Sequence, residues 1–424
     1  MKKQTSQIIL NQAQSFAYET IIDWACMPFM VSDALILSGY AGTGKTTLIK
    51  QIVKNLREKE ISTVLCAPTN KAVKVLKNLD TSSDCFTIYS LLGLEMSESE
   101  DTLKLVKKER DRVGSYQLVI LDECSMVTTQ LFEYIQKAID RYRVKFLFVG
   151  DPEQLNPVGE DISPVWGKFE TYMLSEVVRH DNQILNLATA LRTSSLDTFY
   201  ANSDNKDDEG VWKFAKREFI EAIKSNAKDF ENDAKAIAWR NTTVDYLNKT
   251  IRQEIHGSES AKTRWLPKDK IVFTQPYISF DDNLAPFFRN IITDEEATVV
   301  SVKLDKHNFL PELLCYYLTL DFEDELQRNI TLIHEDSEEK FKSMLEMLAS
   351  SARLTRKWDD FWTIKKSVAS VKYAYALTAH RSQGSTYESV YVAMSDILLN
   401  RNTEEAKRCL YVAVTRPTTK LILG

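Results

Sequence analysis

The pattern of hydrophobic and polar positions changes along the chain and divides its 424 residues into stretches of different character. Over about the first 180 residues, short apolar runs alternate with segments whose apolar residues recur at helical spacing, which is typical of a parallel α/β sheet. The runs are continuous, as expected where helices cover both faces of a sheet. The expected strands are residues 34–38, 63–67, 118–121 and 145–149, and the expected helices include residues 45–56 and 71–79.

A second α/β rhythm follows, and a stretch of different character interrupts it. The apolar runs of this rhythm are residues 234–239, 372–378, 389–393 and 411–414. Between them lie runs typical of β-strands and one helical pattern, at residues 271–274, 297–304, 315–320 and 338–349. An insertion within a second domain explains this order. We therefore predict a first domain of residues 1–178, a second domain of residues 179–265 and 371–424, and an inserted β-rich domain of residues 266–370.

The segment 95–112 breaks the rhythm of the first domain. It is acidic at its start and basic towards its end, with Leu103, Leu105 and Val106 between the two. Such a charge pattern is typical of a solvated loop, although a small protruding hairpin also fits it. The residues by themselves favour the loop.

Composition restricts the class of protein. Hydrophobic residues make up 44% and charged residues 27% of the chain, as in ordinary globular proteins. No apolar run reaches the roughly 18 residues that a membrane-spanning helix needs, and the N-terminus lacks the pattern of a signal peptide. The six cysteines are scattered without a C-x-x-C pair, which favours buried thiols in a reducing compartment over a zinc site or disulfides. We expect a cytoplasmic protein without a membrane partner.

The net charge leaves the question of a nucleic-acid partner open. Many nucleic-acid binders are basic overall, whereas this chain has a formal net charge of -6. A shaped local groove can still bind a polynucleotide, because net charge governs nonspecific attraction more than it governs such a site. Charge therefore neither supports nor excludes a polynucleotide partner.

Residues 39–46 read G-x-x-x-x-G-K-T and lie between an expected strand and an expected helix, which is the context that a phosphate-binding loop requires. Glycines let the backbone N–H groups of such a loop turn inward and form an anion site at the start of the helix. We expect Lys45 to reach the β- and γ-phosphates of ATP and the Thr46 hydroxyl to coordinate Mg²⁺. The expected nucleotide contacts from this loop are Gly42, Thr43, Gly44, Lys45, Thr46 and Thr47.

The expected strand 118–121 ends in two acidic residues, Asp122 and Glu123. An aspartate at this place in nucleotide hydrolases holds Mg²⁺, and we expect Asp122 to do so through water. Glu123 is placed to polarise the attacking water as a general base. Two acidic residues at a strand end can also cap the following helix. The phosphate-binding loop upstream favours the catalytic interpretation.

These residues and several later motifs resemble superfamily 1 DNA helicases. Residues 122–126 and 150–158 are similar to motifs II and III of that family, and residues 378–386 and 410–416 are similar to motifs V and VI. Further matches are the adenine-reading glutamine motif and motifs Ia, Ib and IV, at residues 10–14, 67–72, 87–90 and 174–179. The matches follow the order of the family along nearly the whole chain, which looks closest to the Dda-type helicases of phages, a branch related to RecD.

The resemblance implies a fold and a set of catalytic residues. The fold is α/β, with two RecA-like P-loop NTPase domains, a small hairpin insertion at about residues 93–115 of the first, and an SH3-like insertion in the second. Gln14 would read adenine, and Gln154 would sense the γ-phosphate alongside Lys45 and Glu123. Arg179 in motif IV and Arg416 in motif VI would contact the same phosphate. Because such coupling is reciprocal, single-stranded DNA should stimulate ATP hydrolysis.

The resemblance also implies a groove for single-stranded DNA and a device that separates duplexes. The expected strand contacts are Pro68, Thr69, Asn70, Thr87, Tyr89, Arg240, Thr378 and His380. Motif Ib usually carries a histidine where this chain has Tyr89, so that contact becomes a stack on a base or a hydroxyl bond. Leu103 to Val106 would form the separating tip. The implied enzyme is a monomer that moves 5′ to 3′ and binds single-stranded DNA and single-strand/duplex junctions, with phage single-strand-binding or replisome proteins as further candidate partners.

Three other interpretations stay open. A P-loop kinase or nucleotide switch shares the loop and the aspartate, but it has no use for a second α/β half or for Arg416. A DNA-binding module with a decayed ATP site is opposed by the intact Lys45, Asp122 and Glu123. An RNA motor fits the same motifs, which distinguish the two sugars poorly. We expect an ATP-dependent DNA helicase that takes part in phage DNA replication, recombination or repair.

Overall fold

The computed structural model describes residues 10–424, apart from 31–32, 100–101, 108–109, 177–182, 278–290, 309 and 324–326. The described residues form two compact units. Unit 1 holds the chain up to Lys213 together with Ala379–Thr386 and Ile397–Ile422, and unit 2 holds Phe214–Thr378, Tyr387–Asp396 and Leu423–Gly424. The three domain boundaries drawn from the sequence stay a prediction. None of the described helices is long and apolar enough to cross a bilayer.

Unit 1 is built on a sheet of six parallel strands in the order β3-β2-β6-β7-β1-β8. Every strand expected in this region is confirmed, and two strands at the sheet edges, β3 and β8, are added. The strands are β1 (Ala34–Gly39), β2 (Thr63–Ala67), β3 (Asp84–Thr87), β6 (Leu118–Leu121), β7 (Lys145–Gly150) and β8 (Glu170–Leu174).

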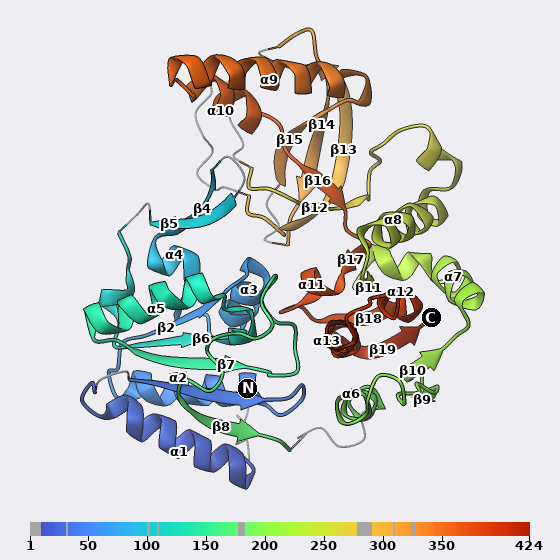
Figure 1. Ribbon diagram of the computed structural model, residues 1–424. Coiled ribbons are helices and arrows are strands. Elements are labelled where there is room, and N and C mark those ends of the chain that lie inside the picture. The colour runs from blue at the N-terminus through green and yellow to red at the C-terminus, as the bar shows by residue number, and fades with distance from the viewer. Residues whose placement is uncertain are drawn as a thin grey trace, which may run out of the picture. The chain divides into compact units, whose positions relative to one another are not determined.

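Helices cover both faces of this sheet, which explains its continuous apolar strands (Figure 1). In β1, Leu35 and Leu37 join the core beneath α1, α2 and α3, whereas Ile36 joins the core beneath α4 and α5. Alternate residues of a strand point to opposite faces, so a strand buried on both sides is apolar throughout. The helices are α1 (Gln12–Cys26), α2 (Lys45–Glu58), α3 (Asn70–Leu79), α4 (Ile88–Leu92) and α5 (Thr129–Tyr142).

The segment after α4 forms an antiparallel pair of strands, β4 (Leu94–Ser99) and β5 (Thr102–Lys107), so its interpretation as a solvated loop is wrong. The expected position of the tip is also wrong. Ser99–Thr102 is the last pair of the two strands before the chain reverses. Leu105, the residue before Val106, is instead buried in the core beside α5. The Leu105 N–H donates to Gln130, and its carbonyl accepts from the Tyr134 hydroxyl at 3.2 Å. These contacts fix the base of the hairpin to α5.

Unit 1 also contains elements from distant parts of the chain. A short antiparallel pair joins β9 (Asp204–Lys206) to β10 (Glu209–Lys213). The helix α13 packs against α6 and α11, which brings the C-terminal motifs into this unit. These helices are α6 (Gln183–Thr193), α11 (Ala379–Ser382) and α13 (Thr403–Val414).

Unit 2 combines a parallel group of strands with an antiparallel insertion. In the parallel group, β11 pairs with both β17 and β18, where the second α/β rhythm was expected. Its elements are α7 (Lys216–Ser225), β11 (Ala234–Ala238), α8 (Asn241–His256), β17 (Ala376–Thr378) and β18 (Tyr387–Val392). Two further elements near the C-terminus are divided between the units: α12 (Met394–Ile397) belongs mostly to unit 2 and β19 (Pro417–Leu423) mostly to unit 1.

The insertion is a five-stranded antiparallel sheet in the order β15-β14-β13-β12-β16. The three β-like runs expected here are confirmed as β12, β13 and β14, and the helical pattern as part of α9. A core around Phe273, Val299 and Leu318 fills the sheet. The elements are β12 (Lys270–Phe273), β13 (Glu296–Lys306), β14 (Leu314–Asp321), β15 (Gln327–Ile333), α9 (Glu338–Thr355), α10 (Asp359–Lys366) and β16 (Val371–Tyr373).

Asp269 joins the insertion to the parallel part of unit 2. Its fully buried carboxylate accepts from Arg252 Nε at 2.9 and 3.1 Å, from the Tyr375 hydroxyl at 3.1 Å and from the Leu266 N–H at 2.8 Å. His256 Nε2 lies 3.1 Å away. Helix α8, the start of the insertion and the segment after β16 are therefore held by one carboxylate.

The substitution Asp269→Ala should lower the free energy of unfolding of unit 2 by about 3–5 kcal/mol, because it leaves the buried Arg252 guanidinium without its partner. Urea unfolding followed by intrinsic fluorescence measures this loss. Asp305, whose exposed carboxylate pairs with Lys303, is the matched control, and Asp305→Ala should leave the midpoint unchanged. Equal midpoints for both variants would contradict the role given to Asp269.

Candidate nucleotide site and nucleic-acid interface

The predicted phosphate-binding loop connects β1 to α2, as the motif requires. Gly42 and Gly44 have φ angles of 77° and 81°, in the left-handed region that glycine adopts without strain. Gly39 has no room for a side chain, because a Cβ there would lie 2.7 Å from Thr43 Oγ1. The loop therefore turns tightly and directs its chain into the N-terminus of α2, where N–H groups are free to bind an anion.

Lys45, the first residue of α2, points back into the loop. Its ammonium donates to the carbonyl oxygens of Gly39 at 2.5 Å and Tyr40 at 3.0 Å. The Thr43 hydroxyl also donates to the Tyr40 carbonyl, at 2.8 Å. A cation is thus held where the loop would surround a phosphate.

Gln14 contacts the loop directly. It is buried near the start of α1, where its side-chain oxygen accepts from the Asn11 N–H at 3.0 Å in a capping box. Its amide nitrogen donates to the carbonyl of Thr43 at 2.9 Å. The expected adenine-reading residue therefore ties the start of α1 to the phosphate-binding loop.

Asp122 and Glu123 follow β6, and the strand order places β7 between them and the phosphate-binding loop. Glu123 has a φ of 54°, which is unusual for a residue with a side chain and is typical of strained functional positions. The Glu123 N–H donates to Asp122 Oδ1 at 2.9 Å. Both acidic groups are thereby held at the same edge of the sheet.

The electrostatics of this pair identify its neighbours. Burial raises the pKa of Asp122, although the N–H of Glu123 and the charge of Lys45 oppose the rise. Burial, followed by the charge of Asp122, raises the pKa of Glu123 to about 7, and Arg416 and Lys45 act in the opposite direction. Lys45 and Arg416 therefore both lie within electrostatic range of Glu123.

Arg416 lies just after α13 and is buried. Its guanidinium donates to the carbonyl of Val412 at 3.0 Å, to the carbonyl of Ser385 at 3.1 Å and to the Thr415 hydroxyl at 3.1 Å. These bonds hold the cation in the range of Glu123. Arg179, the other arginine expected at the γ-phosphate, lies outside the described residues.

Gln154 occupies the loop after β7, next to the buried Asp151. Its N–H donates to the Asp151 carbonyl at 3.2 Å. Its side chain is also buried, and among the described residues the Oε1 atom has no hydrogen-bond partner. An unpaired buried acceptor is unfavourable unless a ligand or water supplies a donor.

Three residues that sequence reasoning missed connect these loops. The Tyr411 hydroxyl donates to Asp151 at 2.9 Å and accepts from the Ala41 N–H at 3.1 Å, so it bridges the loop after β7 and the phosphate-binding loop. Arg408 donates to the carbonyl of Gln154 at 2.7 Å. Gln383 donates to the Ser125 hydroxyl at 3.3 Å, just after Glu123. Gln383 and Tyr411 lie inside motifs V and VI, which was the only available signal.

The expected strand contacts of motifs Ia and Ib lie at one edge of the sheet. Pro68, Thr69 and Asn70 follow β2, and Thr87 ends β3, the parallel neighbour of β2. The Thr69 hydroxyl caps α3 and the Thr87 hydroxyl caps α4. Tyr89 is partly buried against the core, and this burial raises the pKa of its hydroxyl.

The remaining expected strand contacts have partners of their own. Arg240 pairs with Asp396 at 2.6 Å and remains about half exposed. Thr378 is buried at the end of β17, opposite Ala238. His380 on α11 is partly buried, which lowers its pKa, and its Nε2 lies 3.7 Å from a carboxylate oxygen of Glu405. The described residues thus place the motif Ia and Ib contacts together in unit 1. His380 belongs to the same unit, whereas Arg240 and Thr378 belong to unit 2.

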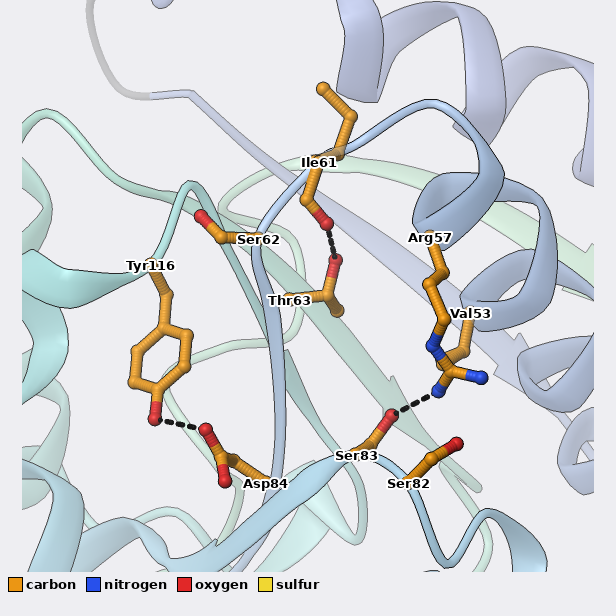
Figure 2. A pocket seen from close by; sticks show the side chains of 9 residues that line it. All are labelled: Val53, Arg57, Ile61, Ser62, Thr63, Ser82, Ser83, Asp84 and Tyr116. Atoms are coloured by element: carbon orange, nitrogen blue, oxygen red, sulfur yellow. Dashed lines mark hydrogen bonds between the residues drawn. The ribbon is translucent and has the colours of Figure 1, made fainter.

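A small pocket lies away from these residues (Figure 2). It has a volume of about 260 Å³ and opens beside Thr63 and Asp84, the first residues of β2 and β3. Tyr116 donates to Asp84 at 2.8 Å and Arg57 donates to Ser83 at 3.1 Å on its wall. The phosphate-binding loop follows the carboxyl end of β1 in the same parallel sheet, so the pocket lies at the opposite edge and is not the nucleotide site.

Comparisons with known proteins agree with this arrangement. A family model described as an AAA domain matches residues 23–214, and one described as the UvrD-like helicase C-terminal domain matches residues 373–423. The chain is 30% identical to the ATP-dependent DNA helicase dda of Enterobacteria phage T4 over 420 residues, covering 90% of this chain and 92% of that protein. It is 24% identical to the ATP-dependent DNA helicase Pif1 of Campylobacter jejuni, over 91% and 87% of the two chains.

A solved structure shares the fold. The crystal structure of Pif1 helicase from Candida albicans superposes with a TM-score of 0.52 at 17% identity, covering 99% of this chain and 95% of the other. The match to the phage T4 protein extends over nearly the full length of both chains. This chain therefore belongs to the superfamily 1 DNA helicase family that includes Dda.

Proposed function

We propose that the chain is an ATP-dependent DNA helicase that moves 5′ to 3′ along single-stranded DNA and unwinds duplexes. Its place is the replication, recombination or repair of phage DNA in the host cytoplasm, where it acts as a monomer on single strands and single-strand/duplex junctions. Phage single-strand-binding or replisome proteins are the candidate protein partners. The relatives named helicases, which cover nearly the whole chain, support this proposal.

The observation that carries the proposal is the convergence of three distant residues. Lys45 from α2 and Arg416 after α13 both lie within electrostatic range of Glu123 after β6, in unit 1. A kinase or a nucleotide switch shares the phosphate-binding loop, whereas Glu123 as a base together with an arginine from a distant segment serves a hydrolase, in which the cation stabilises the charge of the transferred phosphate. ATP bound by the loop would meet all three groups.

Mg²⁺ fits the acidic end of β6. Burial raises the pKa of Asp122, which means that this carboxylate is unfavourable as an anion until a cation lies near it. Asp122, through water, and the Thr46 hydroxyl are the residues that would hold the ion. When bound, the ion supplies positive charge to the phosphate oxygens.

Glu123 and Gln154 would share the attacking water. Glu123 is the base that takes the proton, because its pKa of about 7 is suited to proton transfer near neutral pH. Gln154 offers a buried oxygen that lacks a donor among the described residues. A water molecule between the two could donate one hydrogen to each. Arg416 would then stabilise the negative charge that develops on the phosphate.

The strand side of the motor would use the residues at the carboxyl ends of two other strands of the same sheet, β2 and β3. Thr69 and Thr87 lie together at the carboxyl ends of β2 and β3, and hydroxyl and backbone groups of this kind bind phosphates without reading sequence. Gly384 of motif V packs against α3, since a Cβ on it would lie 3.1 Å from Ala72. Gln383 beside it bonds to Ser125. Motif V thereby contacts both the strand side and the nucleotide side of unit 1.

The hairpin of β4 and β5 is the candidate for strand separation, and the five-stranded insertion is the candidate SH3-like domain. The hairpin base is fixed to α5 by Leu105. Leu103 pairs with Glu98, next to the last pair before the turn. We therefore assign the separating function to the turn side of the hairpin, with Leu103, and a supporting function to Leu105.

Lys45→Ala should remove ATP hydrolysis and unwinding together. With the native protein, a duplex with a 5′ single-stranded tail should be unwound and one with a 3′ tail should not, and single-stranded DNA should raise the ATPase rate several-fold.

Glu123→Gln should lower the rate of ATP hydrolysis at least about 10²-fold because the base is lost. The exposed Glu133→Gln on α5 is the matched control. An ATPase rate that stays constant across a DNA titration would refute the motor.

The pH dependence of hydrolysis should report Glu123. Its pKa is raised to about 7, so the base is deprotonated above that pH and protonated below it. With Mg²⁺ in excess, kcat/KM for ATP should therefore fall about tenfold per pH unit below pH 7. An acid limb near the ordinary glutamate pKa of about 4.3 would show that another arrangement supplies the base.

Two hairpin variants should differ in their effects on duplex unwinding and on ATP hydrolysis. Leu103→Asp places a charge near the turn and should reduce duplex unwinding, while ATPase activity stimulated by single strands persists. Leu105→Gly removes a core side chain and should reduce both activities, because it loosens the hairpin base and the core beside α5. Unwinding and ATPase rates of the two variants are measured side by side. Equal loss of both rates in Leu103→Asp would make the whole hairpin structural.

A further inference from the structure

Three side chains with metal-binding atoms gather beside α13, away from the acidic pair. Glu405 and Cys409 are four residues apart on that helix and therefore share one face of it. His380 comes from α11, which packs against α13. One ligand atom from each of the three residues lies within 4.8 Å of the other two, and His380 Nε2 lies 3.7 Å from Glu405 Oε1.

The donor set identifies the class of ion. An imidazole nitrogen, a thiol sulfur and a carboxylate oxygen suit zinc and related transition metals, whereas Mg²⁺ and Ca²⁺ take oxygen ligands. Zinc bonds of about 2.0–2.3 Å at tetrahedral angles bring ligand atoms to roughly 3.3–3.6 Å from each other. The separations of up to 4.8 Å exceed this by roughly 1.2–1.5 Å at most, which side-chain rotations can close.

The burial of the three residues gives such an ion a way in. Cys409 is fully buried, and the side chains of His380 and Glu405 are 33% and 39% exposed. The ion would enter between the imidazole and the carboxylate and reach the sulfur beneath them. Three protein ligands would leave one tetrahedral position for water, as in open zinc sites. When the metal–sulfur bond forms, the thiol proton leaves to solvent.

We propose that His380, Glu405 and Cys409 bind one zinc-class transition-metal ion, and that the bound ion weakens the grip on single-stranded DNA. The second part rests on the proposed function, in which His380 contacts the strand. An ion on His380 Nε2 removes that nitrogen from the strand. The same helix carries Arg408 and Tyr411, so an ion that holds α13 to α11 also acts on the helix that contacts the nucleotide loops.

Cobalt titration of the full-length protein tests the site without any need for activity. Co²⁺ should produce a thiolate charge-transfer absorption that saturates at a single equivalent, and Zn²⁺ should abolish it by displacement. Cys409→Ser should lack this absorption. Cys26→Ser, which removes an exposed thiol, should retain it.

Glu405→Gln keeps the test valid if the buried Cys409→Ser variant does not fold. Loss of this ligand should weaken cobalt binding by at least about 10–100-fold, the range that follows loss of a group supporting a metal site. Its neighbour Glu404 is exposed on the same helical turn, so Glu404→Gln is the matched control and should bind as the native protein does. Equal affinities for the two glutamine variants, or a native protein without the absorption, would overturn the site.

The effect on DNA is measured separately. DNA binding is followed by the fluorescence anisotropy of a labelled oligothymidine, without nucleotide. Addition of buffered free Zn²⁺ should weaken DNA binding by the native protein and should leave DNA binding by Glu405→Gln as it is without Zn²⁺. A cobalt site with unchanged anisotropy would overturn the regulatory part alone. Failure of the proposed helicase function would appear differently, as absent ATPase and unwinding with an intact cobalt spectrum.

Discussion

Two acidic side chains held together at the end of β6 determine where the cations of the nucleotide site lie. Asp122 and Glu123 share a place where burial makes negative charge unfavourable, as the raised pKa of each shows. Lys45 and Arg416 are the cations that offset this charge, and they come from opposite ends of the chain. The negative charge of the acidic pair thus stabilises the C-terminal Arg416 near the phosphate-binding loop, even without a nucleotide.

Hydrogen bonds from α13 give the same arrangement its geometry. The Tyr411 hydroxyl joins Ala41 of the phosphate-binding loop to Asp151, and Arg408 holds the carbonyl of Gln154. These bonds run to backbone groups or to a fully buried carboxylate, so they orient whole loops. Helix α13 therefore connects the phosphate-binding loop to the loop after β7, which would sense the γ-phosphate. The same helix carries Glu405 and Cys409, which adds metal-binding side chains to one element.

The elements predictable from the sequence were those whose local pattern has one physical cause. Strands covered on both faces, such as β1 and β7, must be apolar throughout, and the glycines of the phosphate-binding loop must take left-handed backbone angles. The edge strand β8 was missed because most of its side chains are exposed, which leaves no apolar run to detect. The hairpin looked like a loop because its sequence has no continuous apolar run, and the described side chains that join a core are Leu94 and Leu105.

The site was predictable in part for a related reason. Motif residues such as Lys45 and Glu123 are recognisable by their neighbours in the chain, whereas the partners of Tyr411 and the gathering of His380 with Cys409 depend on which segments meet in space. No spacing in the chain encodes those meetings. The scattered cysteines argued against a zinc site for the same reason, since a search for clustered ligands along the sequence cannot see a cluster that the fold assembles.

The strand order of unit 1 has a consequence for size. Neighbouring strands lie about 4.8 Å apart, so the insertion of β7 between β1 and β6 separates the loop that holds Lys45 from the base Glu123 by roughly 10 Å of sheet. Such a gap is about as wide as a terminal phosphoryl group with a water molecule in line behind it. A sheet with β1 and β6 adjacent would roughly halve that separation.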